Sequence, residues 1–125
     1  MIAKKIQVQV FNFNFANRQQ RLLLKLYLNV GHCYIKVQWF KKACLALQKA
    51  LEIESNNSKA LYRLGKAKMA LANFDDARRF FIKAQAVSDD PAIGRELANL
   101  DRQLKTDQDN QRALCRRMFG GDGSR

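Results

Sequence analysis

Residues 31–50, GHCYIKVQWFKKACLALQKA, recur as residues 65–84, GKAKMALANFDDARRFFIKA. A shift of 34 residues superimposes all of 24–57 on 58–91 without an insertion or a deletion. Large apolar residues also meet large apolar residues, as at Leu47 and Phe81. Five of the identical pairs mark the two units: Gly31 with Gly65, Phe40 with Phe74, Ala43 with Ala77, Lys49 with Lys83, and Ala50 with Ala84.

Each unit has the pattern of two helices joined by a turn. The first half of each unit carries apolar residues at helical spacing, as at Tyr27, Val30 and Tyr34. A glycine inside a helix costs about 1 kcal/mol against alanine, so we expect Gly31 and Gly65 to allow close approach of a second helix. A 34-residue helix–turn–helix period resembles the tetratricopeptide repeat. The sequence predicts an all-α solenoid with helices near 22–37, 40–54, 58–72 and 75–88.

Residues 92–119 are predicted to form one long capping helix after the repeats. Asp90 and Pro91 have the pattern of a helix start, with Asp as the cap and Pro at the first helical position. Apolar residues then follow at helical spacing and can cover the open end of the stack, as terminal repeats must. They are Ile93, Leu97, Leu100 and Leu104. Residues 120–125 are expected to be a flexible tail.

Residues 1–21 do not match the repeat and form an atypical N-terminal segment. The stretch IQVQVFNFNFA, residues 6–16, alternates apolar and polar residues, which is typical of a strand. No other part of the chain offers it a strand partner. The alternatives are an extended or disordered segment, a helix imposed by its context, or a remnant of another repeat.

Composition narrows the class of protein. The chain has 125 residues and a formal net charge of +12, which favours acidic partners. Its three cysteines are widely spaced, so neither a zinc site nor a disulfide framework is expected, and Cys33 and Cys44 fall at apolar helical positions typical of buried thiols. Together with the lack of a long apolar run or a signal-peptide pattern, this favours a reducing cytoplasmic or nuclear setting.

The candidate site lies on the first helices of the two units, which line a concave groove in stacked repeats. Asn29 and Arg63 occupy the same position in their units, and Lys59 precedes Arg63 by one helical turn. An amide and two cations suit a carboxylate, because they supply charge-assisted hydrogen bonds. Residues expected at the periphery of the groove are Lys25, His32, Lys36, Tyr62 and Lys66.

The repeats from Leu28 to Ala67 resemble those of the large FKBP-type immunophilins. In that family a carboxylate clamp holds the acidic C-terminal peptide of heat-shock protein 90, and the clamp Asn, Lys and Arg fall on Asn29, Lys59 and Arg63. The family draws a further Lys and Asn from an earlier helix, and residues 1–21 have no matching motif. The resemblance therefore implies a co-chaperone-type adaptor with a partial clamp, from the C-terminal part of such a protein.

The end of the capping helix also resembles that family. Residues 115–119, CRRMF, are similar to the segment that closes its final helix, a region associated with calmodulin. The motif followed by GDGS resembles the germline, Shutdown-like branch of inactive members. A short basic amphipathic stretch is typical of calmodulin targets. Its residues are Arg112, Leu114, Arg116, Arg117, Met118 and Phe119.

An enzyme is not expected. His32 is the only histidine, no glycine-rich phosphate loop is present, and the isomerase domain of the family has no counterpart here. We expect no cofactor, no metal and no small-molecule substrate. Two alternatives to peptide binding remain: a basic scaffold that associates with nucleic acid or membrane through diffuse charge, and a structural repeat fragment without a ligand.

Overall fold

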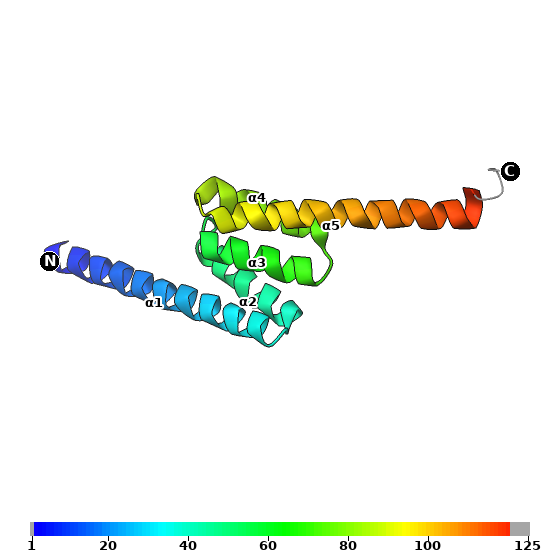
Figure 1. The fold of residues 1–125 in the computed structure, drawn as a ribbon. Helices are drawn as coiled ribbons and strands as arrows, with labels where there is room; N and C mark the ends of the chain where they lie inside the picture. The colour runs from blue at the N-terminus through cyan, green and yellow to red at the C-terminus, as the bar shows by residue number, and fades with distance from the viewer. Residues whose placement is uncertain (1, 121–125) are drawn as a thin grey trace.

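Five α-helices and a final π-helical turn make up residues 2–120, which are the residues that the computed structural model describes (Figure 1). The predicted all-α solenoid with a long capping helix is confirmed, and no strand is present among the described residues. The helices run as two antiparallel pairs followed by the cap. Their bounds are α1 Ile2–Lys36, α2 Phe40–Ile53, α3 Ser58–Ala70, α4 Phe74–Val87 and α5 Pro91–Cys115, with η1 at Arg116–Gly120.

The turns inside the two pairs repeat each other bond for bond. The amide of Trp39 donates to the carbonyl of Tyr34 at 2.8 Å, and the amide of Asn73 donates to Lys68 at 2.9 Å, which are equivalent positions. Gln38 and Ala72, one residue earlier, have φ of 65° and 63°. This left-handed residue ends the helix and lets the chain reverse. The sequence repeat therefore corresponds to a repeat of backbone geometry.

Side-chain caps mark the first turns of α3 and α5. The Asn57 carboxamide accepts the amide of Ala60 at 2.9 Å, and the Asp90 carboxylate accepts the amide of Ala92 at 3.0 Å. Both satisfy backbone N–H groups that have no partner within the helix. Pro91 occupies the first turn of α5, as predicted. These caps define the first residues of α3 and α5.

Each pair closes around one glycine. A Cβ added at Gly31 would lie 2.7 Å from the Leu47 side chain, and one added at Gly65 would lie 2.7 Å from the Phe81 ring. Leu47 and Phe81 are fully buried. The paired helices therefore approach so closely that only glycine fits, as the sequence predicts.

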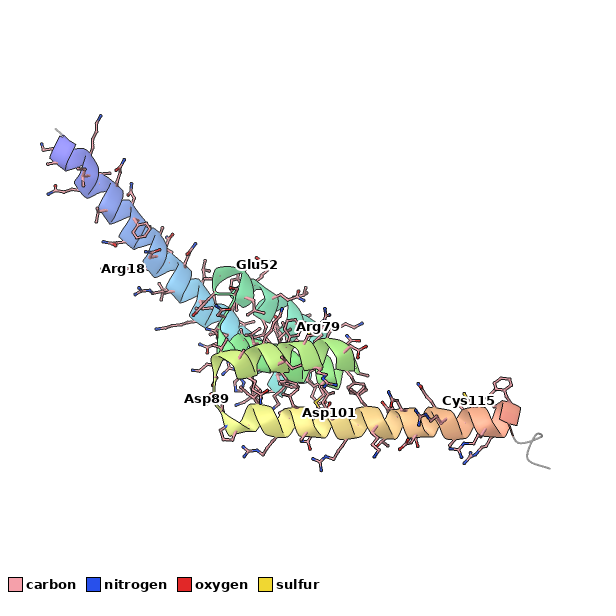
Figure 2. All side chains as sticks on the ribbon, turned by 90° about the horizontal axis from the view of Figure 1, so that it is seen from above. Arg18, Glu52, Arg79, Asp89, Asp101 and Cys115 are labelled. Atoms are coloured by element: carbon pink, nitrogen blue, oxygen red, sulfur yellow. The ribbon has the colours of Figure 1, made fainter. Side chains whose placement is uncertain are left out.

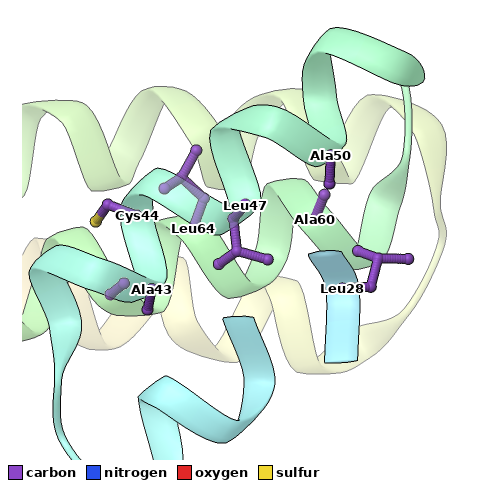
Figure 3. Close-up of a cluster of buried hydrophobic side chains, with 8 residues drawn as sticks. Leu28, Ala43, Cys44, Leu47, Ala50, Ala60 and Leu64 are labelled. Atoms are coloured by element: carbon purple, nitrogen blue, oxygen red, sulfur yellow. The ribbon is translucent and has the colours of Figure 1, made fainter. Parts of the chain in front are cut away.

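The first core cluster joins α1, α2 and α3 (Figure 3). Small side chains alternate with leucines, which lets α3 pack against both helices of the first pair. No buried residue of the described chain is polar or charged, so the stack is held by apolar burial. The members of this cluster are Leu28, Ala43, Cys44, Leu47, Ala50, Ala60, Leu64 and Ala67.

The second core cluster joins α3, α4 and α5 in the same way. Ile93 and Leu100 pack on Phe81 and Leu61, with Leu97 and Leu104 at the edge. These four α5 residues take the places that Ala60, Leu64 and Ala67 hold on α3 and that Leu71 holds directly after it. The offset is 33 rather than 34, because three residues connect α4 to α5 where four connect α2 to α3.

Of the alternatives left open for residues 1–21, the structure shows the helix: residues 2–21 belong to α1, and the helix start predicted near residue 22 is wrong. With no neighbouring strand, only a helix satisfies the backbone hydrogen bonds within the segment. In a helix the alternating pattern spreads its apolar residues over opposite faces. This part of α1 extends past α2 (Figure 1), and Ile6, Val8, Val10, Phe13 and Phe15 are exposed.

The burial predicted for Cys33 is also wrong, whereas Cys44 is buried as expected. Cys33 is equivalent to Ala67, which lies in the first core cluster because α2 precedes α3. Within residues 2–120 no helix covers the corresponding face of α1, and Leu26 and Val37 on the same face are exposed too. None of the helices in the described part of the chain is long and apolar enough to cross a membrane.

Candidate functional site

The groove predicted from the sequence corresponds to the faces of α1, α3 and α5 that point away from the second helix of each pair, and we refer to these faces as the groove. On α3 this face carries Lys59, Tyr62, Arg63 and Lys66, spaced three or four residues apart and opposite the buried Ala60 and Leu64. Arg63 occupies the side of this face nearer α1, and Tyr62 the side nearer α5. The two residues therefore belong to different halves of the groove.

Arg63 connects α3 to α1. Its Nη1 donates to the backbone carbonyl of Leu28 at 3.1 Å, and its side chain is half-buried. Leu28 directly precedes Asn29, so the guanidinium is fixed beside the turn of α1 that carries the predicted amide. Arg63 has four further N–H donors for a ligand. This contact places the Arg63 guanidinium at the turn of α1 that carries Asn29, another of the three predicted clamp residues.

Lys59 lies one turn before Arg63 on α3 and is exposed, as is Asn29. Lys25 holds on α1 the position that Lys59 holds on α3, and it is exposed one turn before Asn29. Both lysines can bring their charges toward a ligand that reaches Arg63. The α1–α3 half of the groove is thus lined by cations with one neutral amide among them.

His32 lies one turn beyond Leu28 on α1 and is half-buried. Its burial, followed by the positive charges of Arg63, Lys36 and Lys66, holds the pKa of its imidazole below the ordinary value. These charges come from both α1 and α3. Four of the predicted site residues therefore share one positive field.

Tyr62 marks the boundary with the other half of the groove. Its ring centroid lies 5.9 Å from that of Phe81, and the Lys66 ammonium lies 5.5 Å from the Tyr62 ring centroid. Burial first, and then the negative charges of Glu96 and Asp90, raise the pKa of the Tyr62 phenol, while Arg95 lowers it. The α5 side of the groove is therefore partly acidic.

Glu96 is a groove residue that the sequence analysis missed. It holds on α5 the position of Arg63 on α3, but only when the offset of 33 residues is used. The sequence does contain the information needed to identify Glu96. The spacing of Ile93, Leu97, Leu100 and Leu104 matches the buried face of α3 at an offset of 33 residues. The groove thus carries an amide, a guanidinium and a carboxylate at the same position of its three successive helices.

The predicted calmodulin-type stretch lies far from the groove, at the end of α5 (Figure 2). Arg112 and Leu114 lie in the last turn of α5, and Arg116–Gly120 form the π-helical turn η1. Its apolar side chains are exposed, with Phe119 77% accessible. They do not pack back on the capping helix.

Comparison with known proteins agrees with this fold. The tetratricopeptide-repeat family model matches residues 40–100. Human peptidyl-prolyl cis-trans isomerase FKBP4 is 34% identical over 110 residues, which are 87% of this chain and 24% of that protein. Arabidopsis thaliana peptidyl-prolyl cis-trans isomerase FKBP42 is 36% identical over 116 residues, 89% of this chain and 32% of that protein.

The inactive peptidyl-prolyl cis-trans isomerase FKBP6 of Mus musculus is 34% identical over 106 residues, 82% of this chain and 32% of that protein. Among solved structures, the C-terminal TPR-containing domain of a Plasmodium falciparum FK506-binding protein has a TM-score of 0.71 at 27% identity, covering 75% of this chain and 63% of that one. A MamA variant has a TM-score of 0.62 at 25% identity, covering 75% of this chain and 77% of that one.

The fold and the family match over residues 40–100 identify a tetratricopeptide-repeat domain, a class of protein-interaction module. Within that class, the chain is homologous to the C-terminal region of the FKBP-type immunophilins. It spans about a quarter to a third of the length of these curated relatives. The homology therefore concerns their repeat domain.

Proposed function

We propose that the α1–α3 half of the groove binds the free C-terminal carboxylate of an acidic peptide, and that the chain is a co-chaperone-type adaptor for the C-terminal peptide of heat-shock protein 90. The observation that carries the proposal is the Arg63 guanidinium, fixed to the Leu28 carbonyl beside Asn29. A fixed guanidinium loses little conformational freedom when it binds a carboxylate. Lys59 supplies a second charge one turn away.

The expected affinity is low. A directed, charge-assisted hydrogen bond contributes about 1.5–3 kcal/mol, whereas an exposed peripheral charge contributes about 0–1 kcal/mol. The Lys and Asn that complete the family's clamp have no matching motif in residues 1–21. We expect a Kd on the order of tens of micromolar or weaker, which corresponds to about −6 kcal/mol.

The first test is a calorimetric titration with an acidic peptide that ends in a free carboxylate, compared with the same peptide amidated at its C-terminus. The clamp requires the carboxylate, so the amidated peptide is expected to bind at least tenfold more weakly. A scaffold that acts through diffuse charge, the alternative for nucleic acid or membrane, would hardly distinguish the two peptides. A repeat fragment without a ligand would bind neither.

The second test compares single variants with the free-carboxylate peptide. Asn29→Ala and Arg63→Ala are each expected to weaken binding more than Lys66→Ala, although Asn29→Ala removes no charge. Lys49→Ala, on the exposed side of α2, is the matched control for the loss of one remote charge. Because Arg63 also bonds to Leu28, the thermal stability of each variant is measured in parallel. Equal losses for the charge variants, with none for Asn29→Ala, would disprove an assembled clamp.

The cellular setting is part of the proposal. Three free cysteines, one of them buried and two exposed, agree with a reducing compartment such as the cytoplasm. The germline, Shutdown-like assignment stays a prediction, because the identity to the inactive isomerase FKBP6 equals the identity to FKBP4.

A further inference from the structure

His32 is the single histidine of the chain, and α1 places it on the groove side, three residues beyond Asn29. The Leu28 carbonyl that accepts the Arg63 guanidinium lies one turn before it. The charged groups that act on its imidazole are Lys36 on its own helix and Arg63 and Lys66 on α3. Three cations from two helices therefore act on an imidazole that can itself become positively charged.

We infer that His32 is a proton-dependent member of the anion site: the groove takes up a proton at His32 when a carboxylate enters, and it binds acidic peptides more tightly at mildly acidic pH. This inference rests on the proposed function, since it assigns a further residue to the same site. A neutral imidazole offers one N–H donor, whereas the imidazolium offers two donors and a positive charge. Protonation thus turns His32 into a carboxylate ligand.

The groups around His32 determine whether peptide binding favours or disfavours its protonation. In the empty groove, partial burial and three positive neighbours disfavour the imidazolium. A carboxylate bound at Arg63 and Asn29 adds a negative charge among the same groups, which favours the imidazolium. Binding and protonation are reciprocal, so whatever favours the proton on His32 in the complex also favours the complex at lower pH.

Known charge interactions set limits on how much tighter the peptide binds when His32 is protonated. An opposite charge within about 4–6 Å shifts a pKa by about 1–3 units, and a partly solvated groove lies at the lower end of that range. We therefore expect the peptide to bind about three- to tenfold more tightly at a pH of about 5.5 than at about 7.5. Peptide carboxylates, with ordinary pKa values of about 4, stay ionised over this range.

The experiment uses the single histidine as its own reporter. The imidazole Cε1–H signal is followed by NMR as the pH is lowered, in the free protein and with saturating free-carboxylate or amidated acidic peptide. The free-carboxylate peptide is expected to raise the pKa of His32 by about one unit, and the amidated peptide by clearly less. Calorimetry in buffers of different ionisation enthalpy is expected to show proton uptake on binding.

His32→Gln is the matched variant, because it keeps a polar side chain of similar reach without a titratable group. It is expected to bind the free-carboxylate peptide with a pH-independent Kd between about 5.5 and 7.5. Circular dichroism checks that the variant keeps the helical fold. If the parent's pH dependence persists in His32→Gln, the proton goes to another group and the inference is wrong.

The outcomes separate the two proposals. A clear preference for the free carboxylate, with no change in the pKa of His32 and no proton uptake, overturns the role of His32 and leaves the clamp standing. Equal binding of the free and amidated peptides overturns the clamp and, with it, the inference. A raised pKa with proton uptake that is lost in His32→Gln supports both.

Discussion

At the scale of single residues, Gly65 determines how closely α3 and α4 pack. Glycine in a helix normally costs about 1 kcal/mol of stability against alanine, and nothing within the helix itself offsets that cost. Here the missing Cβ leaves the space that the Phe81 ring occupies. Gly31 and Leu47 form the same contact in the first pair, so the two units share one packing solution.

Replacing a helical glycine with alanine usually stabilises a protein, and we expect the opposite at Gly65. Gly65→Ala is expected to destabilise the protein, because its Cβ would lie 2.7 Å from a fully buried ring. Overpacking typically costs about 1–3 kcal/mol, and Gly65→Leu is expected to cost at least as much. Gly94→Ala, where the nearest atom is Gln85 Nε2 at 4.0 Å, is the matched control and is expected to stabilise by up to about 1 kcal/mol.

Urea unfolding monitored by circular dichroism measures both variants. The two substitutions add the same methyl group to a helix, so the difference between them isolates the contact with Phe81. A Gly65→Ala protein as stable as the Gly94→Ala protein would mean that the ring moves aside at no cost.

At the scale of helices, the sequence predicts what the repeat contains and fails where the repeat stops. The bounds predicted for the four repeat helices agree with α2, α3 and α4 to within two residues at each end, and with the end of α1. Cys33 shows what the repeat pattern alone does not predict. Its position is apolar in both units, but its burial depends on whether another helix precedes its own.

The sequence leaves the conformation of residues 1–21 open and places the start of the first helix near residue 22, about 20 residues too late, for a physical reason. Alternation of apolar and polar residues is typical of a half-buried strand only when a second strand can pair with it. Residues 2–21 have none among the described residues, and they extend the helix that the first repeat starts. The missed Glu96 has a different cause: one residue fewer before α5 shifts its register, and a fixed period of 34 overlooks that shift.

The end of α5 carries the element-scale prediction. Leu114, Met118 and Phe119 are exposed beside Arg112, Arg116 and Arg117, an arrangement that suits the hydrophobic grooves of calmodulin. We expect calcium-dependent retention of the chain on immobilised calmodulin, and loss of that retention when residues 111–125 are deleted. Replacing the three apolar residues with glutamine, while keeping the three arginines, is expected to abolish retention as well.

The controls for this prediction distinguish apolar docking from charge. Retention without calcium, or in the triple glutamine variant, would indicate simple attraction between a basic chain and an acidic protein. Retention that survives deletion of residues 111–125 would exclude this stretch as the binding element. Peptide binding at the groove is expected to be unchanged by the deletion, since the stretch lies far from α1 and α3 (Figure 2).

At the scale of the whole molecule, the positive charge is only slightly offset. The net charge is +12, and α1 contains no acidic residue over its 35 residues. Within residues 2–120, two ion pairs are present: Arg78 with Asp101 at 3.4 Å, between α4 and α5, and Arg79 with Asp76 inside α4. Both are largely exposed, and exposed pairs contribute about 0–1 kcal/mol. Repulsion among like charges therefore opposes the compact state.

The last prediction follows from that imbalance. Raising the NaCl concentration from about 20 to about 300 mM shortens the Debye length from about 20 Å to below 10 Å, which screens the repulsion across the stack. We expect the melting temperature to rise by several degrees, on the order of 1 kcal/mol of stability for a domain of this size. The same salt is expected to weaken binding of the acidic peptide, because that attraction is screened too. Differential scanning calorimetry and peptide titration in identical buffers measure the two trends. A melting temperature that falls with salt would mean that attractive pairs such as Arg78–Asp101 outweigh the repulsion, and peptide binding that ignores salt would argue against an electrostatic groove.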